Sequence, residues 1–255
     1  MKKLYIIGMG PGDLNYLAPA ARKALAASSD IVAYQLYLDL LGEVIADKQH
    51  HALDLGKEIE RAELALNLAA EKQCVALVSS GDAGIFAMAT LVFELLDKQP
   101  KAIWNDIDIE VIAGISALQL AASRVGAPLA HDFCAISLSD LLTPWETINT
   151  RIHAAAQGDF VIAFYNPVSK KRDWQLDHAK QVLLKHRPTD CPVIIARNLS
   201  RPDENITVTT LEKLDSTQVD MLTLVMVGNS ETRAFAKGVY TPRGYSKKLQ
   251  LETQA

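Results

Sequence analysis

The feature that most constrains this chain is a unit that recurs along it: an apolar run, a turn of glycine and small residues, and then a helical pattern. In its clearest copy the apolar residues 74–78 lead into Ser79-Ser80-Gly81-Asp82-Ala83-Gly84, and apolar side chains then recur three or four positions apart. A short apolar run of this kind is typical of a strand that is buried in a parallel sheet. The chain therefore predicts an α/β fold, in which ligands bind outside the carboxyl ends of the strands.

Taken alone, this turn is also explained as a tight connection in which Asp82 caps the next helix. Its recurrence favours a ligand site instead. Residues 4–7 run into Gly8-Met9-Gly10-Pro11-Gly12-Asp13, and residues 109–112 run into Ala113-Gly114-Ile115-Ser116-Ala117. Glycine lets the backbone turn sharply and come close to a bound molecule.

The first glycine-rich turn does not match the usual nucleotide-binding patterns. A dinucleotide fingerprint needs G-x-G-x-x-G, but here the third glycine comes one residue early, after Pro11. A P-loop is excluded because no Gly-Lys-Ser/Thr follows. A nicotinamide enzyme would want an acidic residue at the end of the second predicted strand, 30–34, where Gln35 stands. A nicotinamide oxidoreductase therefore remains an alternative that the spacing disfavours.

Composition and charge limit the class of protein. The 255 residues carry 26 Lys and Arg against 30 Asp and Glu, a formal net charge of −4, which argues against a nucleic-acid binder. Three widely spaced cysteines offer neither a disulfide framework nor a zinc-binding spacing, so we expect a reducing cytoplasm. The apolar run after Lys3 is too short for a signal peptide, and no run approaches the ~18 residues of a membrane span.

Gly126-Ala127-Pro128 ends a helical pattern and predicts a domain boundary. We therefore expect an N-terminal α/β domain at 1–127, a C-terminal α/β domain at 128–245 and a flexible tail at 246–255.

Apolar runs predict the strands of the second domain at 133–138, 160–165, 193–196, 206–209 and 222–227, of which 206–209 alternates like an edge strand. Thr143, Pro144 and Glu146 have the spacing of a capping box. Lys170-Lys171-Arg172 is predicted to begin a helix that reaches Arg187.

Several stretches together carry a resemblance to a known family. They are Gly8-Met9-Gly10-Pro11-Gly12-Asp13, Ser79-Ser80-Gly81-Asp82-Ala83-Gly84-Ile85-Phe86, Ala113-Gly114-Ile115-Ser116-Ala117 and Phe164-Tyr165-Asn166-Pro167. On these stretches the chain resembles the tetrapyrrole methylases, which are S-adenosylmethionine-dependent methyltransferases, over almost its whole length. A narrower likeness is to members that methylate ring carbon 17 of precorrin-3B or its cobalt-containing counterpart. It rests on the same Phe-Tyr-Asn-Pro run and on His131-Asp132-Phe133-Cys134, Ser137-Leu138-Ser139-Asp140-Leu141-Leu142-Thr143-Pro144-Trp145 and Thr241-Pro242-Arg243-Gly244-Tyr245.

The resemblance implies two α/β domains with S-adenosylmethionine in the cleft between them and S-adenosylhomocysteine as product. It implies methylation of carbon 17 with contraction of the macrocycle in cobalamin (vitamin B12) biosynthesis. The expected assembly is a cytoplasmic homodimer that binds a tetrapyrrole, with no nucleic acid, membrane or metal site. Methylation at another ring position and a tetrapyrrole-binding protein without chemistry remain alternatives.

Carried over position by position, the family's cofactor contacts fall on residues whose small size exposes peptide groups: Pro11, Ser80, Gly81, Asp82, Ile85, Ser116, Ala117, Asn166 and Leu199. Asp82 would accept a hydrogen bond from the ribose hydroxyls or from the amino group. Two positions depart from the family pattern, because Ala113 replaces a usual Pro and Asn166 stands where many relatives have Met.

The carboxylate arms of a tetrapyrrole call for cations, and the candidates by position are Lys57, Arg61, Lys171, Arg172 and Arg243. Each could equally be a surface charge. Ring contraction moves protons, so a general acid or base is expected. The resemblance makes Lys57 the first candidate, followed by Glu58 and His131, although the cysteine that close relatives often have near Lys57 is absent.

Overall fold

The computed structural model describes residues 2–71, 74–245 and 248. The chain divides into two compact units, Met1–Ala117 and Leu118–Ala255, which confirms the α/β fold class. The division falls at the start of α5 (Ala117–Val125), a helix that the predicted boundary at 127 assigns to the N-terminal domain. Apart from Lys248, the predicted tail at 246–255 lies outside the described residues.

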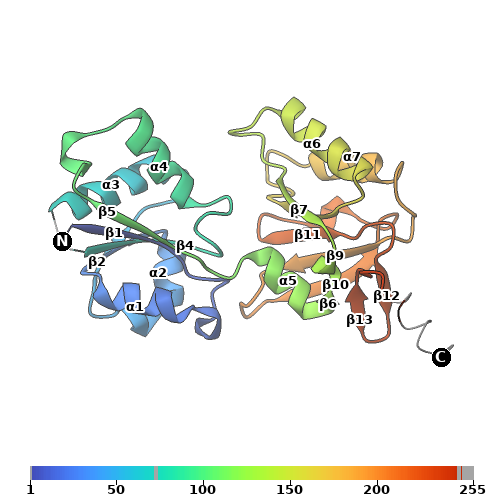
Figure 1. Ribbon diagram of the computed structural model, residues 1–255, viewed down its shortest axis with the longest axis horizontal. Coiled ribbons are helices and arrows are strands. Elements are labelled where there is room, and N and C mark those ends of the chain that lie inside the picture. The colour runs from blue at the N-terminus through green and yellow to red at the C-terminus, as the bar shows by residue number, and fades with distance from the viewer. Residues whose placement is uncertain (1, 72–73, 246–247, 249–255) are drawn as a thin grey trace. The chain divides into compact units, whose positions relative to one another are not determined.

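The first unit is built on a five-stranded parallel sheet in the order β3-β2-β4-β1-β5 (Figure 1). Its strands are β1 (Lys3–Gly8), β2 (Asp30–Ala33), β3 (Gln49–Ala52), β4 (Cys74–Ser79) and β5 (Asp108–Ile112). Its α-helices are α1 (Pro19–Ala27), α2 (Gln35–Leu41), α3 (Glu58–Glu71) and α4 (Met88–Lys98). Because β4, β1 and β5 are parallel neighbours, their carboxyl ends lie side by side at one edge.

Alternate residues of the central strands face two separate cores. Leu4 and Ile6 pack with apolar side chains of α3 and α4, whereas Ile7 packs with those of α1 and α2. Figure 1 shows the same layers, with α3 and α4 on one face of the sheet and α1 and α2 on the other. Burial on both faces explains why these strands are uninterrupted apolar runs in the sequence.

The second unit has a mixed sheet in the order β10-β9-β11-β8-β7. Its strands are β7 (Phe133–Ser137), β8 (Val161–Tyr165), β9 (Pro192–Arg197), β10 (Asn205–Thr210) and β11 (Thr223–Val227). The helices α6 (Trp145–Gln157) and α7 (Gln175–Leu183) pack against its core. Since β11 is antiparallel to both β8 and β9, and β7 is parallel to β8, the carboxyl ends of β7, β8 and β9 lie at the same edge. The predicted edge strand is confirmed as β10.

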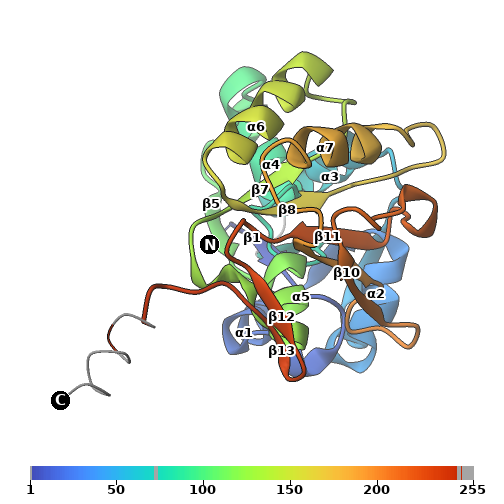
Figure 2. The same ribbon diagram turned by 90° about the vertical axis from the view of Figure 1, so that its right-hand side faces the viewer.

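A small third sheet joins β6 (Gly126–Ala127) to β13 (Gly238–Tyr240), which pairs in turn with β12 (Arg233–Phe235). Figure 2 shows the β12–β13 hairpin beside α5. A Cβ on Gly126 would lie 2.5 Å from the carbonyl oxygen of Val239, so this close pairing requires glycine. The remaining short 3₁₀ helices are Leu14–Tyr16, Gly42–Ile45, Ala102–Trp104, Pro128–Ala130 and Ser216–Gln218.

Two local predictions for the second unit are wrong. Helix α6 has Pro144 as its N-cap and no capping hydrogen bond from any described side chain, so the predicted capping box does not form. Lys170 and Lys171 do not begin a helix either, because Ser169 and Arg172 pair as an isolated β-bridge around them and α7 starts later, at Gln175.

Candidate functional site

The three glycine-containing turns of the first unit follow β1, β4 and β5, and hydrogen bonds join the turn after β4 to each of the other two. Gly10 and Gly81 form an isolated antiparallel bridge, in which the amide of Gly10 donates to the carbonyl of Gly81 at 3.1 Å and the amide of Gly81 donates back at 2.8 Å. The amide of Met9 donates to the carbonyl of Ser79 at 2.9 Å. The recurring unit in the sequence therefore forms one continuous wall of peptide groups at the carboxyl edge of the sheet.

Glycine is required in this wall for two different reasons. A Cβ on Gly8 would lie 2.6 Å from the carbonyl oxygen of Gly81, and a Cβ on Gly114 would lie 2.5 Å from that of Gly8. Only glycine at these two positions therefore lets the turns come this close. Gly81 differs, because its backbone has a φ of +67° and the nearest atom to an added Cβ is the Cα of Ser116, at 3.9 Å. The space beside Gly81 is therefore open.

Asp82 links two of the turns through its side chain. Its Oδ1 accepts from the amide of Gly84 at 2.8 Å and its Oδ2 accepts from the amide of Gly114 at 3.0 Å. Asp82 does not cap the following helix, since α4 begins at Met88 with Ala87 as its N-cap. A contact between Asp82 and a cofactor stays a prediction, and its carboxylate already shapes the wall on which that cofactor would lie.

The other predicted cofactor residues of this unit differ in exposure. Pro11 and Ser116 are buried, Ser80 and Ala117 are half-buried, and Ile85 is exposed. Beneath them lies Ser79, 4% exposed, whose hydroxyl has no hydrogen-bond partner among the described residues. A wall of peptide groups, hydroxyls and one carboxylate, with an open position beside Gly81, fits a polar ligand held by backbone contacts.

Asn166 and Leu199 lie at the carboxyl edge of the second unit's sheet. Asn166 follows β8 with a φ of +49°, and its side-chain amide donates to the hydroxyl of Ser137 at 3.1 Å. Leu199 is 8% exposed and lies in the loop after β9. Their sharing of a cofactor with residues of the first unit stays a prediction.

The predicted substrate cations are not equivalent. Arg61 is 4% exposed, and its Nη2 donates to the carbonyls of Leu53 and Asp54 at 2.9 and 2.6 Å. Arg172 is 5% exposed, and its Nη1 donates to the carbonyl of Leu138 at 3.2 Å and to that of Asn166.

Both guanidinium groups donate to carbonyls of the loops around them, and their role as cations for substrate arms stays a prediction. Burial lowers the pKa of Arg172, against the raising effect of Asp140. Lys171 and Arg243, by contrast, are exposed.

The predicted catalytic residues lie at or just before the start of α3. The side chain of Lys57 is exposed, and its Nζ lies 2.8 Å from Oε1 of Glu60; this hydrogen bond raises the pKa of Lys57. Lys57 is thus protonated at neutral pH. Oε1 of Glu58 accepts from the amide of Gly56 at 3.0 Å. A pocket of about 330 Å³ is lined by Ala52, Leu53, Asp54, Lys57 and Glu60.

His131 lies apart from these residues in sequence, in the loop before β7, and is exposed; its Nδ1 accepts from the amide of Asp132 at 2.8 Å. Proton transfer by Lys57, Glu58 or His131 stays a prediction.

Three supporting residues were not singled out by the sequence. Ser137 holds the side chain of Asn166, and the hydroxyl of Tyr165 accepts from the amide of Leu118 at 3.2 Å. Asp140 lies 3.7 Å from Nε of Arg172. All three belong to the motifs behind the family resemblance, but only the folded chain shows which partner each one has.

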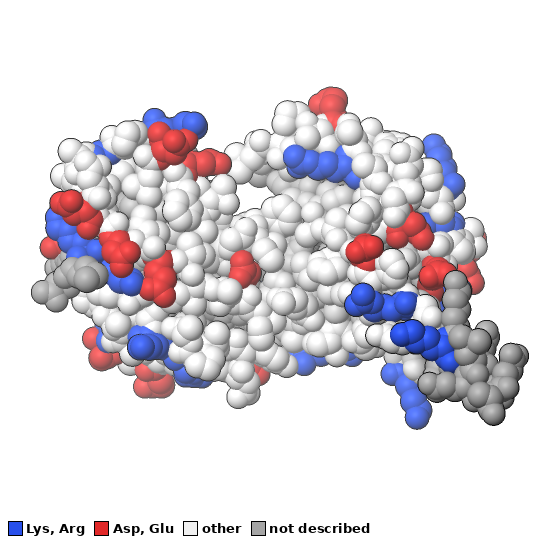
Figure 3. Space-filling view, viewed as in Figure 1, with Lys and Arg blue, Asp and Glu red and all other residues white. Residues whose placement is uncertain are grey.

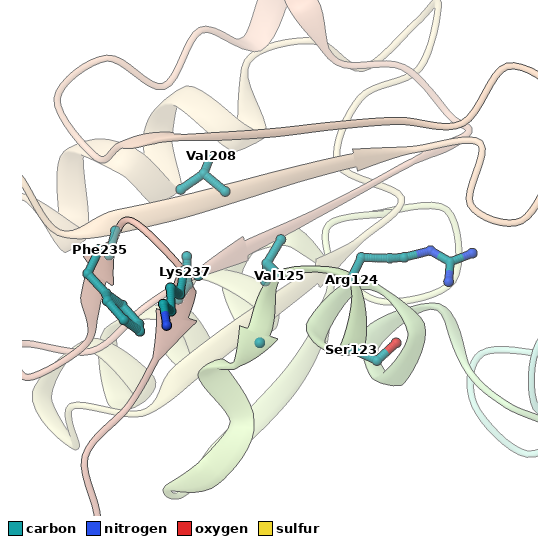
Figure 4. Close-up of a pocket in the computed structure, with 10 residues that line it drawn as sticks. Ser123, Arg124, Val125, Val208, Phe235 and Lys237 are labelled. Carbon is teal, nitrogen blue, oxygen red and sulfur yellow. The ribbon is translucent and has the colours of Figure 1, made fainter.

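A larger pocket of about 510 Å³ lies elsewhere in the second unit, between the end of α5, strand β10 and the β12–β13 hairpin. Figure 4 shows Val208 above it, with Phe235 and Lys237 on the hairpin. The described residues that line it include none of the predicted site residues.

Surface charge and metal-ligating side chains do not mark a further site among the described residues. On the face in Figure 3, positive and negative side chains are scattered over each unit. Among the described residues, no group of three or more His, Cys, Asp or Glu side chains could hold a metal ion. No helix within the described ranges is long and apolar enough to cross a membrane.

Comparison with known proteins places this geometry in a family. Residues 3–215 match the model of the tetrapyrrole (corrin/porphyrin) methylases. The chain is 44% identical over 248 residues to a precorrin-3B C(17)-methyltransferase of a Sinorhizobium species, covering 95% of this chain and 97% of the relative. It is 43% identical over 249 residues to a cobalt-factor III methyltransferase of Priestia megaterium, covering 98% of this chain and 46% of that protein. The chain thus spans about half the length of the second relative and nearly all of the first.

The fold agrees with this assignment. The crystal structure of the methyltransferase CobJ matches with a TM-score of 0.88 at 40% identity, covering 94% of this chain and 99% of that one. The family match includes all three glycine-containing turns of the first unit and the carboxyl edge of the second. This chain belongs to the tetrapyrrole methylase family.

Proposed function

We propose that this chain transfers the methyl group of S-adenosylmethionine to carbon 17 of precorrin-3B, or of its cobalt-containing counterpart, with contraction of the macrocycle in cobalamin biosynthesis. The observation that carries the proposal is 43–44% identity, over 95–98% of this chain, to proteins named for methylation of precorrin-3B and cobalt-factor III. The wall of peptide groups beside Gly81 supports the choice of cofactor, because it can bind a polar ligand mainly through backbone hydrogen bonds.

The residues that would hold the cofactor are Pro11, Ser80, Gly81, Asp82, Ile85, Ser116, Ala117, Asn166 and Leu199. When bound, S-adenosylmethionine supplies a methyl group on a cationic sulfur that leaves as a neutral thioether. The chain's contribution is therefore alignment and exclusion of water, which a rigid wall provides. The bonds between Gly10 and Gly81 and those of Asp82 supply this rigidity.

Proton transfer during ring contraction falls to residues near the start of α3. The hydrogen bond that Lys57 donates to Glu60 raises the pKa of Lys57, so its ammonium can donate a proton or bind a carboxylate arm but does not act as a base at neutral pH. Glu58 is the neighbouring carboxylate and would accept protons. Lys171 and Arg243 would bind further substrate arms.

The same family membership supports a homodimer in the cytoplasm with a tetrapyrrole as its small-molecule partner. Sedimentation equilibrium of the full chain tests the assembly: the expected mass is twice the 27.9 kDa of one chain. A mass of one chain at micromolar concentration would contradict the dimer. It would not bear on the proposed methyl transfer.

The reaction is tested by incubating the full chain with S-adenosylmethionine and either precorrin-3B or cobalt-factor III. Mass spectrometry should show a ring product heavier by one methyl group, together with S-adenosylhomocysteine. The substrate that reacts decides between the metal-free and cobalt-containing forms. Ring binding without methyl gain or S-adenosylhomocysteine would instead identify a tetrapyrrole-binding protein without this chemistry.

A further inference from the structure

Two adjacent leucines are exposed in the loop between β7 and α6. Leu141 is 86% exposed and Leu142 is 98% exposed; we refer to them as the leucine pair. A single exposed leucine is common in soluble proteins, but two in succession need a reason when the surrounding loop is held in place.

The base of this loop is fixed by hydrogen bonds. The amide of Leu138 donates to the carbonyl of Tyr165 at 2.9 Å, and the amide of Ser139 donates to the hydroxyl of Ser137 at 3.3 Å. Asp140 accepts from the side-chain amide of Gln175 at 3.2 Å. The residues immediately before the leucine pair are therefore anchored, so the loop presents these two side chains on a defined support.

Arg172 links the base of this loop to the loop before β11. Its guanidinium donates to the carbonyl of Leu138 and lies 3.8 Å from the sulfur of Met221. Met221 and Leu222, 51% and 47% exposed, precede β11, whose first residues lie at the edge where β8 and β9 end. Two loops that Arg172 contacts thus carry exposed apolar side chains, at the edge where ligands of such sheets bind.

Cations border this apolar surface. Lys170 and Lys171 are exposed in the turn closed by the bridge between Ser169 and Arg172. The acidic neighbours are Asp140, which is engaged by Arg172 and Gln175, and the exposed Asp173. An apolar surface next to two lysines matches a ligand that combines a broad apolar face with carboxylate groups on its rim.

We propose that the leucine pair, together with Met221 and Leu222, forms the surface that contacts one face of the tetrapyrrole macrocycle, while Lys170 and Lys171 bind its carboxylate arms. This inference rests on the proposed function, which supplies a ligand of that chemistry. Beyond the proposed role of Lys171, it assigns contact with the ring face to four apolar side chains of the second unit.

The test compares Leu141→Ser/Leu142→Ser with Ile103→Ser, a control at a 55% exposed aliphatic residue of the other unit. The probe is uroporphyrin III, a stable tetrapyrrole with acetate and propionate arms, titrated by absorbance. We expect the double variant to raise its Kd about tenfold, since contact area with two leucines is lost, and the control to leave it unchanged. The Kd for S-adenosylmethionine should stay within twofold in both variants, which shows that the chain is folded.

A second variant separates apolar from charged contacts. Lys170→Gln/Lys171→Gln should weaken uroporphyrin binding and reduce its dependence on salt, whereas the leucine double variant should keep the salt dependence of the parent. Unchanged uroporphyrin affinity in the leucine variant would overturn the proposal. If that unchanged affinity came with a loss of dimer in sedimentation, the leucine pair would be a protein interface instead. Failure of the parent chain to methylate either precorrin, with normal ring binding, would overturn the proposed function alone.

Discussion

At the scale of single residues, Gly81 is the position where the cofactor site is most easily tested. Its φ of +67° favours glycine, and the space into which a Cβ would project is open up to Ser116. Gly244 has a similar φ of +85° and no atom within 4 Å of an added Cβ. The two glycines therefore match in backbone strain, and only Gly81 belongs to the proposed site.

Gly81→Ala is expected to raise the Kd for S-adenosylmethionine by about tenfold, because the added methyl occupies space beside the peptide groups that bind the cofactor. Gly244→Ala should bind as the parent does. Both variants should lose about 1 kcal/mol of stability from the left-handed backbone. Isothermal titration calorimetry measures the affinities, and equal Kd values for the two variants would place the cofactor elsewhere.

Replacing Arg172 should lower the stability of the chain, whereas replacing its neighbour Lys171 should not. Arg172→Met leaves the carbonyls of Leu138 and Asn166 without this hydrogen-bond donor inside the protein. The free energy of unfolding measured in urea should therefore fall by about 2–4 kcal/mol. Lys171→Met removes an exposed charge and should leave the urea midpoint unchanged. If Arg172→Met unfolded like the parent, the guanidinium would not hold these loops.

Cys191 provides a pH-dependent test of the second unit's core. Burial raises the pKa of its thiol from 9.0 to about 11. Between these values the unfolded chain releases a proton that the folded chain keeps, so stability falls as pH rises from 9 to 11, by about 2 kcal/mol from this group. Urea unfolding of the parent and of Cys191→Ala isolates that loss, which the variant should lack. Parallel stability curves over this range would contradict the buried thiol.

At the scale of secondary-structure elements, the strands that carry the site could be predicted from the sequence. Their uninterrupted apolar runs and the small residues after them follow directly from burial on both faces and from the need for a close turn. The start of α7 could not be predicted, because Lys170, Lys171 and Arg172 look like the polar first turn of a helix. The structure instead uses Arg172 to bind carbonyls from two loops, and a sequence does not show which carbonyls a loop will offer.

The contacts of Arg61 and Asp82 could not be predicted from the sequence either. The sequence places Arg61 near the start of a helix, where it looks like a surface charge, yet it is buried against the carbonyls of Leu53 and Asp54. Asp82 looks like a helix cap, yet it accepts hydrogen bonds from the amides of Gly84 and Gly114. Predicting the contact between Asp82 and Gly114 requires knowing which turns are neighbours in the sheet. Predicting that of Arg61 requires knowing how the chain folds back between β3 and α3.

Asp82→Ala should therefore loosen the link between the turns after β4 and β5. We expect a stability loss of about 1–3 kcal/mol and weaker S-adenosylmethionine binding, because two amides lose their acceptor. Asp215→Ala is the matched control, since Asp215 also accepts from a backbone amide, that of Thr217 at 2.9 Å, but in a separate turn. Thermal unfolding and calorimetry measure both effects. Cofactor affinity that fell equally in the two variants would remove the special role of Asp82.

At the scale of the whole molecule, each unit has its own sheet and its own core, and each contributes one carboxyl edge with predicted ligand contacts. The first unit supplies a wall of peptide groups, which fits a cofactor bound through the backbone, together with Lys57 and Glu58. The second supplies exposed apolar side chains and lysines, which fit a large ring with carboxylate arms, together with the predicted cofactor contacts Asn166 and Leu199. Predicted contacts for both a cofactor and a ring agree with a two-substrate transferase.

The most direct test of the central claim is to let the full chain react with S-adenosylmethionine labelled with ¹³C in its methyl group and with the precorrin form that it accepts. Carbon NMR of the isolated product then locates the label. We expect one labelled methyl group, attached to carbon 17 of a contracted macrocycle. A label on any other ring carbon, or a ring that gains none, would contradict it.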